Sequence, residues 1–260
     1  MLVVSRYRAR EMDSVTYGPV KPLGSTPKRM FNRRIGEGIS QPPWSWRAGV
    51  LAVLAAFAGF LGLPVLFAAA TSCGLPDLNG FWPNLFYALP MMGALAWLTR
   101  QGGTTIGTAF GLRRAPVGRV LISGLLLHFL EWTLMVVITL ALTRLGFEYG
   151  LGDAEEAKEA AGSVLVLTND VVWAPMGEEL WFRGLLYTCL RTRFGVAPSA
   201  IVTAALFSLF HYPETLERAA TLFLPAILSS LWYERTRSLW PNMVSHSLNN
   251  TLVTVFHAGG

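Results

Sequence analysis

Charged residues are scarce in this sequence of 260 amino acids, of which only 14% are charged while 52% are hydrophobic. The mean hydropathy is correspondingly high, at +0.43. This shortage of charge excludes an ordinary soluble globular domain, in which about a quarter of the residues are charged. The composition therefore predicts a protein with several membrane-spanning segments.

Cysteine is also rare, because Cys73 and Cys189 are the only two. They form neither a C-x-x-C pair nor a zinc-ligand spacing, and neither lies in a C-terminal lipidation box. We therefore expect no function from cysteine chemistry. The formal net charge is +5, but the basic residues lie between apolar runs without interleaved aromatics, so nucleic acid is not an expected partner.

The first 48 residues lack an apolar stretch long enough for the core of a signal peptide. They contain nine Lys or Arg and three acidic residues. We predict that residues 1–48 form a polar, basic and flexible cytoplasmic arm, either a solvated leader or a segment that binds a partner. Residues 49–260 are then predicted to be a transmembrane helical domain.

Apolar segments of suitable length recur through this second part. A helix rises 1.5 Å per residue, so about 20 residues cross a hydrocarbon core of roughly 30 Å. On this basis we predict an all-α bundle of about seven transmembrane helices, at residues 49–70, 81–99, 120–142, 163–190, 198–212, 219–233 and 239–256.

The distribution of basic residues gives this bundle an orientation. If successive connections alternate between the two sides, 17 of the 21 Lys and Arg fall on the side of the N-terminus. The positive-inside rule then predicts a cytoplasmic N-terminus and an outside C-terminus. We expect an integral, multi-pass protein of the cell membrane whose oligomeric state the sequence does not determine.

The polar centre of this apolar domain is the segment 175–187, which contains Glu178, Glu179 and Arg183. Ionisable groups inside a membrane are costly and usually mark a functional site. Glu179 and Arg183 are four residues apart and share a helix face, whereas Glu178 points about 100° away. We predict that Arg183 neutralises Glu179 and that Glu178 remains available for chemistry.

Two later spans bring further polar groups to a similar depth. Counting from the predicted inner ends, Glu178, His211, His246 and Asn250 all lie about 12 to 20 Å from one surface. His246 and Asn250 are four residues apart and share a face. The same spacing relates Phe207 to His211 and predicts that the ring packs beside the imidazole. Any single one of these groups is often only structural, but their common depth favours a site.

This set of side chains suits hydrolysis of a peptide bond by activated water. Glu178 could accept a proton from water, His211 could orient that water or share the role of base, and His246 with Asn250 could bind the oxyanion. A serine mechanism is disfavoured because there is no G-x-S-x-G motif. We expect no cofactor, although zinc bound by Glu178, His211 and His246 stays open despite the absence of H-E-x-x-H.

At these positions the sequence resembles a known family. The resemblance rests on three motifs in order: Glu178-Glu179-x-x-x-Arg183, Phe207-x-x-x-His211 and His246-x-x-x-Asn250. They resemble the motifs of the CPBP intramembrane proteases, which include the type II CAAX prenyl endopeptidases and bacterial bacteriocin-processing and immunity proteins. The similar region is the protease-like core, residues 163–256.

The resemblance implies a helical membrane core with an active site inside the bilayer that is reached from the cytoplasmic side. It implies that Glu178 is the general base with His211 as its partner. His246 and Asn250 resemble the oxyanion-binding pair, and the remaining motif residues are supports. The expected activity is endopeptidase cleavage of a membrane-associated peptide or protein. The alternative is a non-catalytic immunity or peptide-binding membrane protein that uses the same polar pocket. A transporter is disfavoured because no paired halves are evident.

Overall fold

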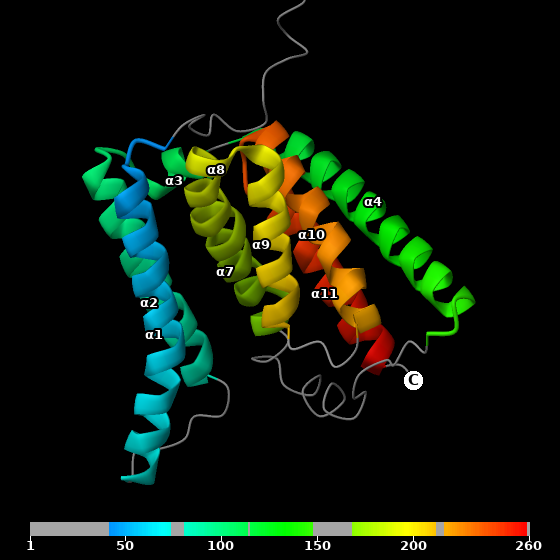
Figure 1. Ribbon diagram of the computed structural model, residues 1–260, viewed down its shortest axis with the longest axis horizontal. Coiled ribbons are helices and arrows are strands. Elements are labelled where there is room, and N and C mark those ends of the chain that lie inside the picture. Colours follow the sequence, from blue (N-terminus) through cyan, green and yellow to red (C-terminus); the bar gives the residue numbers. More distant parts are fainter. Residues whose placement is uncertain (1–41, 74–80, 114, 148–167, 212–215, 259–260) are drawn as a thin grey trace, which may run out of the picture. The chain divides into compact units, whose positions relative to one another are not determined.

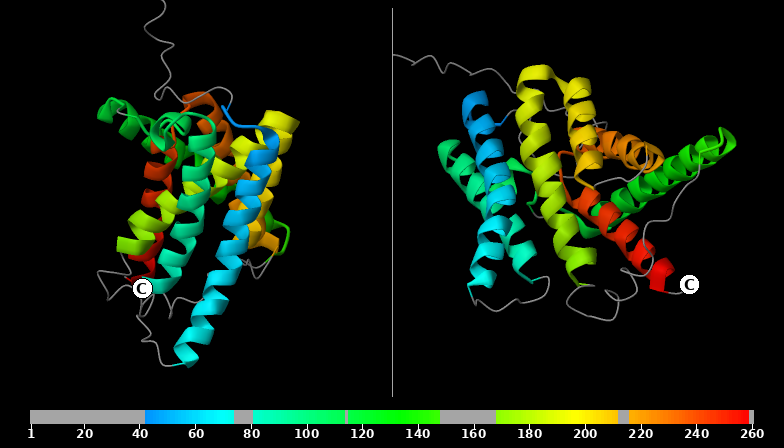
Figure 2. Two further views of the ribbon diagram at one scale, coloured as in Figure 1. Left: turned by 90° about the vertical axis from the view of Figure 1, so that its left-hand side faces the viewer. Right: turned by 60° about the horizontal axis from the view of Figure 1, so that its bottom comes forward.

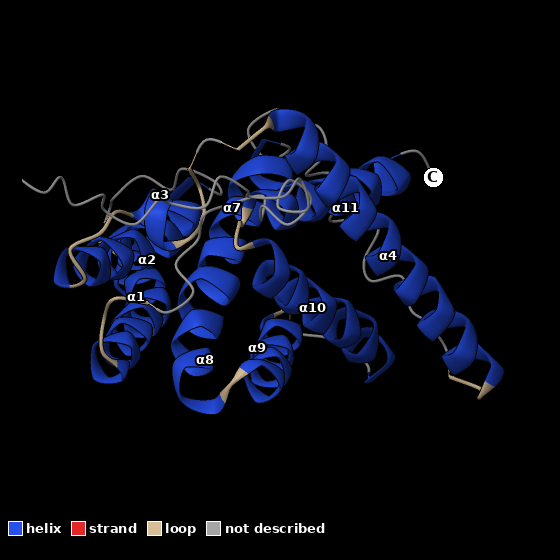
Figure 3. Ribbon diagram, turned by 90° about the horizontal axis from the view of Figure 1, so that it is seen from above, coloured by secondary structure: helices blue, strands red, loops and turns tan. Residues whose placement is uncertain are grey.

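The computed structural model describes residues 42–73, 81–113, 115–147, 168–211 and 216–258. These residues form helices and connecting loops, with no strand among them (Figure 3). They all belong to one compact unit that extends over residues 34–260. The predicted all-α class is therefore confirmed for the described part of the chain. Most of the predicted arm, residues 1–41, lies outside it.

Each predicted apolar segment is helical over its described residues, except that His211 caps α9 and Leu239 precedes α11. The helices are α1 (Trp46–Ser72), α2 (Phe81–Gln101), α3 (Ile106–Ala109), α4 (Val117–Arg144), η2 (Asn169–Trp173), α7 (Ala174–Glu179), η3 (Leu180–Tyr187), α8 (Thr188–Phe194), α9 (Val196–Phe210), α10 (Leu216–Thr236) and α11 (Trp240–Ala258). Among the described helices, one, α4, is long and apolar enough to cross a membrane by length and composition. Seven membrane spans therefore stay a prediction.

The elements η2, α7, η3 and α8 follow one another without a break and form one continuous helix, here called the central helix, over residues 169–194. It contacts α1, α2, α9, α10 and α11. Figure 1 shows α1 and α2 paired beside it, and Figure 2 shows the same pair from two further directions. Helix α4 packs instead on α10 and α11. The central helix thus places its side chains among most of the other helices.

The central helix is irregular because η2 and η3 are π-helical. Pro175 is the second residue of α7, just beyond the end of η2, where proline removes a backbone donor from the helical ladder. π-Helical turns inside α-helices are often found at functional sites. The backbone on both sides of the short helix α7 is therefore wound more widely than in a regular α-helix.

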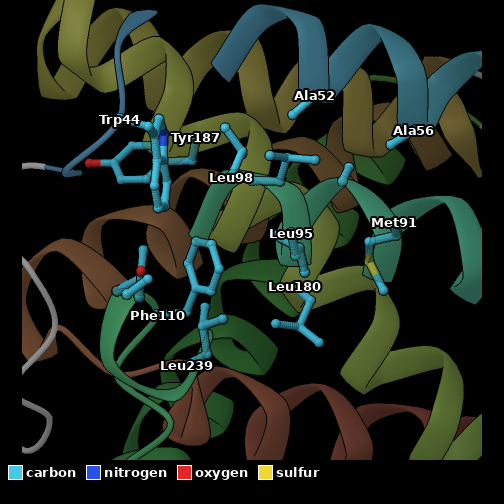
Figure 4. Close-up of a cluster of buried hydrophobic side chains, with 14 of the residues drawn as sticks. Trp44, Ala52, Ala56, Met91, Leu95, Leu98, Phe110, Leu180, Tyr187 and Leu239 are labelled. Atoms are coloured by element: carbon cyan, nitrogen blue, oxygen red, sulfur yellow. The ribbon is translucent and has the colours of Figure 1, made fainter. Parts of the chain in front are cut away.

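A hydrophobic cluster fills the end of the unit near the start of α1. Its members include Trp44, Leu98, Phe110, Tyr187 and Leu239 (Figure 4). The rings of Trp44 and Phe110 are 5.8 Å apart, although Trp44 belongs to the predicted arm. The described end of the arm is therefore part of the hydrophobic core.

Two connections meet tightly beside this cluster. Gly111 has φ +68°, and a Cβ atom built there would lie 1.9 Å from the carbonyl oxygen of Arg237. The Ser238 hydroxyl donates to the Gly111 carbonyl over 2.9 Å. Only glycine combines this left-handed backbone with such a close approach. The connection before α11 is thus held against the connection before α4.

A polar cluster around Glu234 closes the same end. Arg191 donates to Glu234 through Nε and Nη2, at 2.5 and 2.6 Å. Arg237 also donates to Glu234, and the Tyr187 hydroxyl does so over 3.0 Å. Hydrogen bonding to Glu234 raises the pKa of Arg191. These bonds tie the end of the central helix to the end of α10.

Candidate active site

Glu179 and Arg183 form a buried ion pair in the central helix. Their Oε1 and Nη1 atoms are 3.0 Å apart, and each side chain is 2% exposed. Arg183 also donates to the Ala226 carbonyl over 3.4 Å, and its guanidinium carbon lies 4.6 Å from the centre of the Phe207 ring. The pairing predicted from the four-residue spacing is therefore present.

Glu178 faces the two histidines that the sequence motifs single out. Its Oε2 atom is 3.7 Å from Nε2 of His211 and 3.7 Å from Nε2 of His246. These distances are longer than direct hydrogen bonds. Within the described structure, Oε2 of Glu178 has no hydrogen-bond partner. One carboxylate oxygen therefore lies next to two imidazole nitrogens that come from α11 and from the end of α9.

The other nitrogen of each imidazole is fixed by an acceptor. Nδ1 of His211 lies 2.8 Å from the Phe207 carbonyl oxygen, and Nδ1 of His246 lies 3.1 Å from Oε1 of Glu179. A carbonyl oxygen only accepts, so Nδ1 of His211 must carry a hydrogen. The same holds for His246 beside the Glu179 carboxylate. In the neutral form of each histidine, the Nε2 lone pair therefore faces Glu178.

Aromatic packing holds His211 in this orientation. The Phe207 ring and the His211 imidazole are 4.5 Å apart, as the one-turn spacing predicts. Phe207 also contacts His246 at 6.0 Å and Phe182 at 5.0 Å between ring centres. Because Phe207 touches Arg183 as well, it links both histidines to the buried ion pair.

Asn250 makes its bond to the backbone of η2. Its Nδ2 donates to the Asp170 carbonyl over 2.8 Å. The Ala174 amide donates to the Asn169 carbonyl five residues back, so the next donor in this π-helical pattern would be residue 175. Pro175 has no N–H, and the Asn250 side chain supplies a donor in its place. The second N–H of the Asn250 side-chain amide is left for another acceptor. The role of this N–H as a donor to an oxyanion stays a prediction.

Glu131 lies closer to this site than the sequence alone indicated. The Ser245 hydroxyl donates to Oε2 of Glu131 over 2.5 Å, which joins α4 to α11 at the residue before His246. His128 and Glu131 are three residues apart on one helix face, a spacing that allows them to pair with each other or with a neighbouring helix. Nothing in the sequence identified Ser245 as that contact.

A zinc site formed by Glu178, His211 and His246 is the alternative that the sequence leaves open. Among the residues that the structure describes, no group of three His, Cys, Asp or Glu side chains is arranged to hold a metal ion. The arrangement of Glu178, His211 and His246 therefore gives no support to the zinc alternative.

Part of this chain matches a known protein family. Residues 160–252 match the family described as type II CAAX prenyl endopeptidase Rce1-like. The matched region contains all three polar motifs and agrees with the resemblance seen in the sequence. Comparisons with the curated proteins and with the solved structures gave no match.

Proposed function

With residues 160–252 matching the type II CAAX prenyl endopeptidase Rce1-like family, a family of membrane proteases, we propose that this protein is an intramembrane endopeptidase. In this proposal Glu178 activates water, which hydrolyses a peptide bond of a membrane-associated protein or peptide. The proposal includes seven transmembrane helices, a cytoplasmic N-terminus and an active site at bilayer depth. It does not require that the substrate be prenylated.

One observation carries the catalytic assignment. A single oxygen of Glu178 lies 3.7 Å from Nε2 of both His211 and His246. Glu179, the neighbouring carboxylate, is already paired with Arg183 and bonded to His246. Glu178 is therefore the carboxylate of the pair that has capacity to accept a proton from water.

The proposed reaction proceeds by general base catalysis. Glu178 accepts a proton from water as the water oxygen attacks the carbonyl carbon of the substrate, and His211 orients that water through Nε2. The resulting tetrahedral oxyanion accepts hydrogen bonds from the second N–H of Asn250 and from His246 when Nε2 carries a hydrogen. The proton then passes to the leaving amine nitrogen as the C–N bond breaks.

Comparative peptidomics of membranes tests this function. Membranes with the wild-type protein should contain cleavage products that are missing from membranes with Glu178→Gln. Glu131→Gln is a matched control, because it makes the same change of carboxylate to amide outside the proposed catalytic group and keeps an acceptor for Ser245. Products that persist with Glu178→Gln at normal abundance would contradict the assignment of the base.

The same experiment separates the protease from the non-catalytic alternative. A peptide-binding or immunity protein would give identical peptide profiles with wild-type protein and Glu178→Gln, while still retaining peptide on purification.

For the enzyme we expect activity that resists a chelator, because the proposed mechanism uses a glutamate base. Activity that is lost to a chelator and restored by zinc would instead reassign Glu178, His211 and His246 as ligands.

A further inference from the structure

We infer that Glu131 and Ser245 are positioning residues, which act on the proposed reaction through His246. This role rests on the proposed function, because it adds two residues to the support of the same site. Neither residue belongs to the three polar motifs, and Glu131 lies outside the region 160–252 that matches the protease family. In the proposed mechanism the Glu131 carboxylate touches neither water nor substrate, so its effect depends on what it holds in place.

Helix α4 approaches α11 along one narrow face. Gly124, His128 and Glu131 are four and three residues apart, so they share this face. A Cβ atom built on Gly124 would lie only 2.6 Å from Cγ1 of Val244 on α11. Small residues let the backbones of two membrane helices come close together. The two polar residues that follow Gly124 on this face are therefore brought within reach of Ser245.

Ser245 is held by both of these polar residues. Its hydroxyl donates to Oε2 of Glu131 over 2.5 Å, and its backbone forms a hydrogen bond with the His128 imidazole. Ser245 is 1% exposed, so bulk water does not compete with Glu131 as the acceptor of the hydroxyl. These contacts fix the side of α11 that faces α4.

His246, the next residue, is held from a different direction. Side chains of consecutive helical residues project about 100° apart. Nδ1 of His246 lies 3.1 Å from Oε1 of Glu179 on the central helix. Two neighbouring side chains of α11 thus bond to carboxylates on two different helices. Rotating α11 about its axis would lengthen at least one of these bonds, so together they fix its rotation.

The rotation of α11 sets the geometry of the site because His246 and Asn250 both belong to this helix. Side-chain atoms lie about 5–6 Å from a helix axis, so a rotation of roughly 10° moves them by about 1 Å. Nε2 of His246 is 3.7 Å from Oε2 of Glu178, and such a movement would displace it from the carboxylate. A misplacement of about 1 Å in a reacting geometry lowers the rate by on the order of 100-fold.

This role requires a hydrogen-bond acceptor at position 131, not a charge. The amide oxygen of Gln accepts from a hydroxyl as a carboxylate oxygen does, so Glu131→Gln should keep the bond to Ser245. Glu131→Leu and Ser245→Ala each remove it. Ser247→Ala is the matched control, because it deletes the same hydroxyl from α11 about 200° around the helix from Ser245.

Kinetics of the purified protein in detergent, on a peptide that peptidomics shows to be cleaved, test this role. Glu131→Leu and Ser245→Ala should each lower kcat by roughly 10- to 100-fold and leave KM within about twofold of wild type. Glu131→Gln and Ser247→Ala should keep the wild-type kcat. The double variant Glu131→Leu, Ser245→Ala should lose no more than the worse single variant, because both changes remove one bond. A wild-type kcat in Ser245→Ala, or losses that multiply in the double variant, would overturn the role.

NMR of the protein with 15N-labelled histidine gives a readout that needs no turnover. The chain has four histidines, and His246→Gln identifies the His246 signals by their loss. The Nδ1 signal of His246 should move in Ser245→Ala and Glu131→Leu and return to its wild-type position in Glu131→Gln. If Glu131→Leu fails to accumulate, Ser245→Ala decides, since alanine favours a helix.

The two failures are distinguishable. A Nδ1 signal that stays unchanged in Ser245→Ala would contradict the positioning of His246, whatever the turnover. Wild-type protein that cleaves no peptide would contradict the proposed function instead, and the NMR comparison would still decide whether Glu131 and Ser245 hold His246 in place.

Discussion

Substitutions of the two adjacent glutamates, Glu178 and Glu179, should affect different properties of the protein. Glu179→Ala removes the anion that pairs with buried Arg183 and also accepts from Nδ1 of His246. Glu178→Gln removes a carboxylate whose side chain is 32% exposed and whose neighbouring imidazole nitrogens, from His211 and His246, lie 3.7 Å away. We expect the first change to lower stability and the second to lower turnover.

The structure sets the size of the stability effect. Breaking one member of a buried ion pair costs about 3–5 kcal/mol, because the other charge is left in a low-dielectric environment. Arg183 keeps its contact with the Ala226 carbonyl and with the Phe207 ring, so we expect the lower part of that range. A loss of about 3 kcal/mol lowers the melting temperature by on the order of 10 °C in a chain of this size.

Thermal unfolding of purified protein in detergent measures this effect. Glu178→Gln should stay within about 1 kcal/mol of wild type while its turnover falls by a factor of roughly 100 or more. The double variant Glu179→Ala, Arg183→Met should be more stable than Glu179→Ala alone, because it no longer buries an unpaired cation. Equal melting temperatures for Glu179→Ala and Glu178→Gln, without recovery in the double variant, would refute this reasoning.

Three further predictions concern other parts of the fold. Gly111→Ala should lower the free energy of unfolding by at least about 2 kcal/mol, because the added Cβ would lie 1.9 Å from a carbonyl oxygen. Gly103 also has a positive φ but open space around it, so Gly103→Ala should lower the stability less when both variants are compared by thermal unfolding. Asn250→Ala should lower the stability less in a Pro175→Ala background, because the backbone N–H of the alanine introduced there replaces the lost donor. Turnover that stays low in this double variant would support the oxyanion role of Asn250. Turnover that recovers fully would contradict that role. Cys73 is exposed, whereas the other cysteine is buried. Cys73 follows the first predicted span, so the proposed orientation puts it outside, and an impermeant maleimide should label it in intact cells. Labelling only in inside-out vesicles would reverse that orientation.

The local features of the site could be predicted from the sequence. The four-residue spacings give the Glu179–Arg183 ion pair and the packing of Phe207 on His211, and both are present. Such contacts depend only on the geometry of a single helix. The all-α class follows equally directly from the length and composition of the apolar segments.

The contacts between helices could not be predicted in this way. Hydropathy gives the ends of a helix, but its rotation and tilt depend on how all of its neighbours pack. The π-helical turns of the central helix change that rotation further, so spacing alone could not show that His246 bonds to Glu179 or that Asn250 bonds to Asp170.

The sequence by itself therefore determined which residue types belong to the candidate site, and the tertiary structure decided how they are arranged. Both histidines were recognised from their motifs, but only the packing of α9 and α11 on the central helix places their Nε2 atoms beside one oxygen of Glu178. The physical reason is that composition and period describe each helix separately, whereas a catalytic group depends on distances between helices that only their mutual packing fixes.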